Sequence, residues 1–141
     1  MHAYWRHQVF VYGTLRQGGR YHAYLREAPC LGSCWLGPGM TLLDVGAYPG
    51  LVFAGNGWVL GEVYRVTPAM LRRLDRLEDH PRSYRRCRIE TPWGAAWMYL
   101  YKPGARGHGR IPGGDWFDRV RRPAVRPWGC RRGRRGRRRD G

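Results

Sequence analysis

The sequence predicts a single α+β domain that is rich in strands and carries short helices. Residues 8–12 and 58–66 are runs of β-branched and aromatic residues bounded or broken by glycine, as expected for strands that face a core. Residues 67–78 instead repeat leucines at helical spacing. The chain has 141 residues, of which 43% are hydrophobic, with seven Trp and nine Tyr, which suffices for one folded core but hardly for two.

The first predicted strand, residues 8–12, runs into a loop rich in turn-forming residues. Glycines free the backbone of this loop, residues 13–19, so its N–H groups could surround an anion. Strands followed by glycine are common, however, and most of these loops only reverse the chain. The loop matches neither of the glycine-rich patterns typical of nucleotide binding, so it does not indicate that function. A short helix over residues 21–26 is expected next.

The middle of the chain reads as short strands separated by turns. The clearest later strands are expected at residues 40–45, 58–66, 86–90 and 95–101. Residues 46–50 contain proline and two glycines and are expected to form a turn. The last two strands flank residues 91–94, in which proline and glycine are placed as in a type I turn, so they are expected to form a hairpin.

The predicted helix places one carboxylate beside its apolar face. Thr67 is a suitable N-cap, and Pro68 fits the first helical position, where its missing N–H costs nothing. Glu78 follows Leu71 by seven residues and Leu74 by four, so it lies at the edge of the apolar stripe. Burial of an unpaired carboxylate raises its pKa, as in many general acids and bases. Pairing with a nearby arginine is the simpler alternative, and the helix alone favours it.

The net charge of +16 is concentrated towards the C-terminus. Residues 104–141 contain 13 Arg against three Asp, a net charge of +10. We expect a folded domain over residues 1–122 and a disordered Arg-rich tail over residues 123–141, because the tail has too little apolar surface to form a core. The tail has two open interpretations: weak contact with nucleic acid through phosphate groups, or a solvated extension without a selected role.

No apolar run approaches the roughly 18 residues that a membrane-spanning helix needs, and the N-terminus lacks the pattern of a signal peptide. The four cysteines show neither CxxC spacing nor a histidine at zinc-ligand spacing: Cys30, Cys34, Cys87 and Cys130. We therefore expect a cytoplasmic protein with reduced thiols, no membrane association and no metal site.

Two motifs together resemble a known family. Residues 11–15 read V-Y-G-T-L directly after the first strand, and residues 74–84 read L-D-x-L-E-x-x-P-x-x-Y. This pair is similar to the γ-glutamylcyclotransferase-like superfamily, especially its short bacterial members and the γ-glutamylamine cyclotransferases. The resemblance covers residues 8–103, and residues 46–52 and 61–64 also occur in family order. It implies a small mixed β-barrel with short helices packed against it.

The resemblance also implies roles for individual residues. Glu78 corresponds to the catalytic acid/base of the family, and Tyr84 falls near a tyrosine close to its site. The loop whose backbone holds the γ-glutamyl group corresponds to Tyr12, Gly13, Thr14 and Leu15. The implied reaction cyclises a small-molecule γ-glutamyl amide or amine conjugate to 5-oxoproline and a free amine, without a metal or cofactor. The residues themselves support only Glu78 independently, through its place on the apolar stripe.

Two other functions remain open at this point. A module of the same fold could hold a small γ-glutamyl-like ligand without turnover, or the tail could associate with nucleic acid. Experiments would distinguish these functions from the enzyme. Tail-driven binding should weaken steeply with salt, and cyclotransferase activity should survive removal of the tail. A binding module should be protected by its ligand without forming product. The amine that leaves is not determined by the sequence.

Overall fold

The computed structural model describes residues 5–104 and 106–119. The strands are β1 (His7–Val11), β2 (Cys30–Leu36), β3 (Met40–Asp44), β4 (Pro49–Phe53), β5 (Val59–Val66), β6 (Tyr84–Thr91), β7 (Gly94–Tyr101) and β8 (Gly109–Arg110). The helical elements are α1 (Pro68–Leu77) and the 3₁₀ turns η2 (His22–Leu25) and η3 (Trp116–Arg119). The predicted tail and its boundary at residue 123 lie outside the described residues.

The strands form two sheets rather than a closed barrel. The larger sheet has the order β2-β5-β1-β7-β6, and the smaller has the order β4-β3-β8. The α+β class and the mixed sheet are confirmed, since β1 runs antiparallel to β5 and parallel to β7. Closure is not found, because β2 and β6 are the two edges of the larger sheet. The smaller sheet packs against one face of the larger, and residues of both sheets form one hydrophobic cluster.

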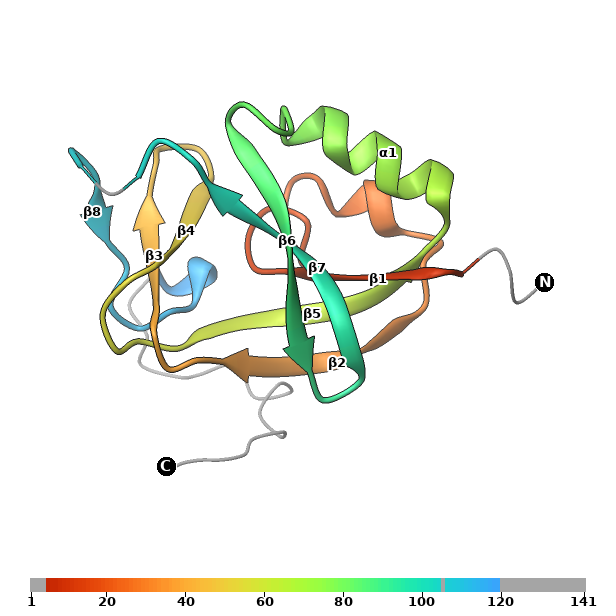
Figure 1. Cartoon of the computed structure of the whole chain (residues 1–141), viewed down its shortest axis with the longest axis horizontal. Coiled ribbons are helices and arrows are strands. Elements are labelled where there is room, and N and C mark those ends of the chain that lie inside the picture. The colour runs from red at the N-terminus through yellow and green to blue at the C-terminus, as the bar shows by residue number, and fades with distance from the viewer. Residues whose placement is uncertain (1–4, 105, 120–141) are drawn as a thin grey trace.

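The larger sheet separates two hydrophobic clusters, because alternate residues of a strand point to opposite faces. Val9 and Val11 of β1 face α1 and η2, together with Leu25, Leu71 and Leu74. Phe10 and Tyr12 face the smaller sheet, and their cluster also contains Leu42, Leu51, Val63 and Met98. Figure 1 shows this arrangement, with α1 over one side of the larger sheet and β3, β4 and β8 at the other end of the view.

The predicted helix forms over nearly the expected residues. The Thr67 hydroxyl accepts a hydrogen bond from the Met70 N–H at 3.0 Å, and Pro68 occupies the first turn. Leu71 and Leu74 are buried beneath it. Among the described residues, no helix is both long and apolar enough to cross a membrane.

The other elements follow the prediction with one correction. The hairpin forms as β6 and β7, and the short helix expected at residues 21–26 is the 3₁₀ turn η2. The turn expected over residues 46–50 is too long, because Pro49 and Gly50 already pair with Asp44 and Leu43 as part of β4. Proline fits there because β4 is an edge strand, where a missing N–H need not break a ladder bond.

Candidate active site

Glu78 stands at the end of α1, as its C-cap. The next residue, Asp79, has a φ of 54°, the left-handed conformation that closes many helices. The His80 N–H then bonds the Asp75 carbonyl at 2.9 Å, and the Asp79 N–H bonds the Arg76 carbonyl at 3.2 Å. This closing pattern holds the backbone on both sides of Glu78 in place.

The structure brings all six predicted site residues to one small cavity. The end of β1 and the following loop contribute Tyr12, Gly13, Thr14 and Leu15, α1 contributes Glu78, and β6 contributes Tyr84. The cavity has a volume of about 30 Å³, and its other lining residues are Phe10, Val11, Tyr48, Pro49 and Tyr99. The segments are distant in sequence, and they meet because β1 is central in the larger sheet.

The Glu78 carboxyl forms no ion pair with any residue that the structure describes. Arg86, one of the cations near it in sequence, instead donates two hydrogen bonds to Asp75, at 2.7 and 3.1 Å. The alternative in which a nearby arginine neutralises Glu78 is therefore not found in the described part of the chain. Burial without a counter-charge raises the pKa of Glu78 from 4.5 to about 7.

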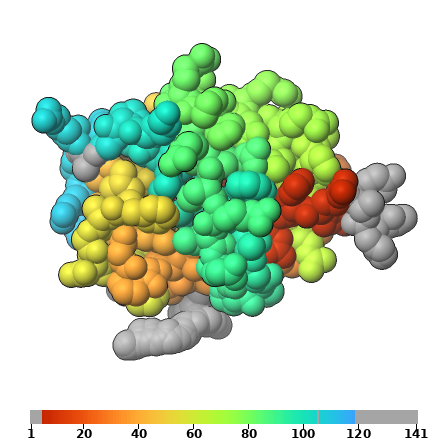
Figure 2. Space-filling model, in the orientation of Figure 1, coloured from red at the N-terminus to blue at the C-terminus, as the bar shows by residue number. Residues whose placement is uncertain are grey.

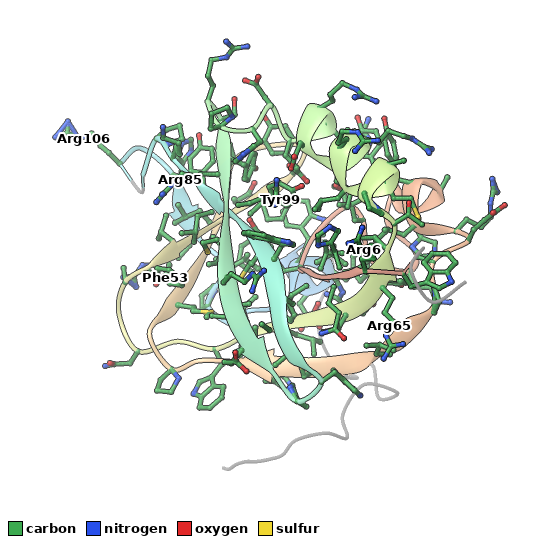
Figure 3. All side chains as sticks on the ribbon, turned by 45° about the vertical axis from the view of Figure 1, so that its right-hand side comes forward. Arg6, Phe53, Arg65, Arg85, Tyr99 and Arg106 are labelled. Carbon is green, nitrogen blue, oxygen red and sulfur yellow. The ribbon has the colours of Figure 1, made fainter. Side chains whose placement is uncertain are left out.

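The buried tyrosines around Glu78 each have a fixed hydrogen-bond acceptor. Tyr12 donates to the Tyr99 carbonyl, Tyr84 to the Pro49 carbonyl and Tyr99 to the Asp75 carboxylate, each at 2.6 Å. Burial raises the pKa of all three phenols, and the negative charge of Glu78 raises it further. These phenols stay protonated and shape the cavity, whereas the Glu78 carboxyl is its titratable group near neutral pH. Figure 3 shows Tyr99 beside α1.

The loop after β1 lines the same cavity and contains backbone N–H groups without a hydrogen-bond partner among the described residues. The Arg16 N–H bonds the Gly13 carbonyl at 3.0 Å, and the Thr14 carbonyl accepts from the Tyr21 N–H at 2.9 Å. The N–H groups of Thr14 and Leu15 donate no hydrogen bond to another described residue. A side chain at Gly13 would overlap the ring of Pro49, so glycine is required for this close approach of the loop to β4.

A buried ion network, which the motifs did not predict, holds the loop after β1. The Arg16 guanidinium, only 3% exposed, lies 3.3 Å from Glu62 and 2.8 Å from Asp115. Glu62 also accepts a hydrogen bond from the Gln17 N–H at 2.9 Å, within the loop itself. The available signals were the position of Arg16 directly after the V-Y-G-T-L motif and the presence of Glu62 in residues 61–64.

Tyr99 and Tyr48 also line the cavity and were not among the predicted site residues. Tyr48 is 43% exposed and lies edge-on to Tyr84, with 6.3 Å between ring centroids. The described residues contain no cluster of three or more His, Cys, Asp or Glu side chains arranged to hold a metal ion.

The family model for γ-glutamyl cyclotransferase, AIG2-like, matches residues 9–118, which include every element of this cavity. The chain belongs to this AIG2-like γ-glutamyl cyclotransferase family. A Vibrio cholerae protein, named as a candidate γ-glutamylcyclotransferase, is 51% identical over 82% of this chain and 99% of its own length. The resemblance inferred from the two motifs is thereby confirmed.

Two further relatives extend the comparison. The crystal structure of a Pyrococcus horikoshii protein has a TM-score of 0.71 and 34% identity, covering 82% of this chain and 92% of that one. The γ-L-glutamyl-butirosin B γ-glutamyl cyclotransferase of Niallia circulans is 38% identical over 66% of this chain and 65% of its own length. These comparisons give no support to nucleic-acid contact through the tail.

Proposed function

We propose that this protein cyclises a small-molecule γ-glutamyl amide or amine conjugate to 5-oxoproline and a free amine, with Glu78 as the general acid/base. The observation that carries the proposal is a carboxyl without an ion-pair partner among the described residues, placed in a cavity that also offers unused backbone N–H groups. Membership of the AIG2-like family supports the reaction class.

The reaction needs one proton to be moved. The neutral α-amino nitrogen of the substrate loses one proton as it forms its bond to the γ-carbonyl carbon, and the leaving nitrogen gains one as its bond to that carbon breaks. A carboxyl with a pKa of about 7 is present in both forms near neutral pH, so Glu78 accepts the first proton and returns it to the leaving amine. No oxidant, reductant or second substrate is consumed.

The loop and the shape of the cavity supply the rest of the proposed catalysis. The N–H groups of Thr14 and Leu15 hold the γ-carbonyl oxygen as it becomes negatively charged, in the manner of an oxyanion hole. The attack is intramolecular, so holding the γ-glutamyl chain in a bent conformation removes much of the entropic barrier. The phenols of Tyr12 and Tyr84 are engaged by backbone carbonyls and act by forming rigid walls.

Substrate entry requires the cavity to enlarge. A volume of about 30 Å³ accommodates little more than one water molecule. Tyr48 is the lining residue with an exposed side chain, and no hydrogen bond holds its phenol to another described residue. We propose that Tyr48 turns outward to admit the γ-glutamyl group and then contacts the leaving amine.

The test is 5-oxoproline release from a panel of γ-glutamyl amines and γ-glutamyl dipeptides. Glu78→Gln should reduce kcat by about 10²- to 10⁴-fold while the protein stays folded, because the amide cannot accept the proton. The matched control is Asp79→Asn, which alters the adjacent carboxylate, outside the cavity lining, and should retain activity. Undiminished turnover by Glu78→Gln would refute the role of this residue. If folded wild-type protein released no product from any panel member, a binding module would become the better explanation.

A further inference from the structure

A second hollow lies away from Glu78, between the start of β1 and the β6–β7 hairpin. β1 pairs with β7 in parallel orientation at Val9 and Trp97. The Gln8 side chain donates hydrogen bonds of 3.1 Å to the Trp93 and Ala95 carbonyls of the hairpin. The groove has a volume of about 400 Å³ and shares no lining residue with the Glu78 cavity.

We call this hollow the basic groove, and its principal residues are Trp5, Arg6, Arg65, Arg88, Trp93 and Trp97. In Figure 2 the segment that begins β1, coloured red, reaches the surface beside the green β6–β7 hairpin. Figure 3 places Arg6 and Arg65 on the same side of the molecule. The arginines come from three separate segments of the chain, so the charge is gathered by the fold and not by one run of sequence.

The basic groove carries positive charge without a balancing carboxylate. None of Arg6, Arg65 and Arg88 forms an ion pair with a described residue, and no Asp or Glu lines the groove. Glu90, two residues from Arg88 on β6, is exposed and lies outside the lining. The pKa of His7 in the groove is lowered, first by burial and then by the charges of nearby arginines. A site with these properties favours an anion.

The same groove presents flat aromatic surface. Trp93 lines the groove and is 37% exposed. The Arg88 guanidinium lies 4.6 Å from the centre of the Trp97 ring, which holds this arginine in a defined orientation. Indole rings beside guanidinium groups bind planar rings by stacking and phosphate oxygens by paired hydrogen bonds.

We propose that the basic groove binds a mononucleotide, with its phosphate on the arginines and its base against the exposed indole of Trp93. A volume of about 400 Å³ is within the usual range for small-ligand sites. Inorganic phosphate would leave the indole surface uncovered, and an uncharged nucleoside would leave the arginines without a counter-charge. The combination of both surfaces therefore selects a ligand that is anionic and also contains a planar ring.

Isothermal titration calorimetry on the full-length chain at fixed salt concentration tests this proposal. Adenosine 5′-monophosphate should bind at least about tenfold more tightly than inorganic phosphate or adenosine, since each of these satisfies half of the groove. Arg65→Gln and Arg88→Gln should each weaken nucleotide binding about tenfold or more. Both arginines are exposed and unpaired among the described residues, so the variants should fold, which thermal unfolding would verify.

The matched control is Arg85→Gln. Arg85 is exposed on β6 like Arg88, but it does not line the groove, and Figure 3 places it far from Arg6 and Arg65. All variants retain the same Arg-rich tail, so a difference between Arg85→Gln and Arg88→Gln reports the groove alone. Equal affinities of these two variants, or binding of a single-stranded oligonucleotide without binding of the mononucleotide, would overturn the proposal. Turnover is not measured, so this result is independent of the proposed reaction.

Discussion

Replacing Glu78 by glutamine should change the pH dependence of stability in a direction that follows from its burial. A glutamate side chain has an ordinary pKa of 4.5, whereas burial raises the pKa of Glu78 in the folded protein to about 7. Between these values the folded protein retains a proton that the unfolded chain has lost. The free energy of unfolding of the wild type therefore falls as pH rises through this window, and glutamine has no such dependence.

The size of the effect follows from the same shift. A rise from 4.5 to about 7 corresponds to roughly 3 kcal/mol once both states are ionised, and about 2.5 kcal/mol of it develops between pH 5 and pH 8. Glu78 as a whole residue is half-buried, so partial contact with water lowers this figure to about 2 kcal/mol. The stability of Glu78→Gln relative to wild type should thus be about 2 kcal/mol greater at pH 8 than at pH 5.

Urea unfolding of both proteins at pH 5 and pH 8 measures this quantity. Urea is uncharged and does not screen electrostatic effects, and the midpoint and slope together yield the free energy of unfolding. All other ionisable groups are the same in both proteins, so their contributions cancel when the two are compared at each pH. A difference between variant and wild type that is the same at both pH values would refute the argument, because it would mean that the Glu78 carboxyl remains hydrated.

Two further predictions concern the reaction and the loop that supports it. kcat/KM for a γ-glutamyl substrate should rise with pH to a plateau with a midpoint near 7, because only ionised Glu78 accepts the proton. A 5-oxoproline assay over pH 5–8 measures this profile, and a midpoint near 4.5 would contradict the prediction. Arg16→Met should lower the free energy of unfolding by about 3–5 kcal/mol, because Glu62 and Asp115 would remain buried without a counter-charge. Urea unfolding beside Arg20→Met, which alters a nearby exposed arginine, tests this, and losses below about 1 kcal/mol in both variants would disprove it.

Local features of the sequence determined the secondary structure closely. Thr67 and Pro68 start α1 because a hydroxyl and a missing N–H act within one helical turn, and no distant residue is needed for that effect. The run of β-branched and aromatic residues at positions 8–12 correctly indicated a buried strand, and the structure buries side chains on both of its faces. The spacing of Glu78 from Leu71 and Leu74 also placed it at the edge of the apolar stripe, from which it reaches the cavity.

The motifs predicted which residues would meet, but not how they are bonded. V-Y-G-T-L and the segment around Glu78 line one cavity because α1 packs on the face of the larger sheet that carries Val9 and Val11, a relation that no local pattern encodes. The sequence alone favoured pairing of Glu78 with an arginine. The register of β6 instead directs Arg86 to Asp75, and this decides that Glu78 has no counter-charge among the described residues.

The remaining features depend on contacts between segments far apart in the chain. Arg16 meets Asp115 across 99 residues, so its buried ion network could not be read from spacing, and the arginines of the basic groove likewise come from three strands or their flanks. Closure of the barrel also depends on tertiary structure, because it requires the two edge strands of the larger sheet, β2 and β6, to pair with each other, and they do not. Short-range sequence therefore determined the elements and singled out Glu78, whereas packing of the two sheets decided which residues surround this carboxyl and that no described arginine pairs with it.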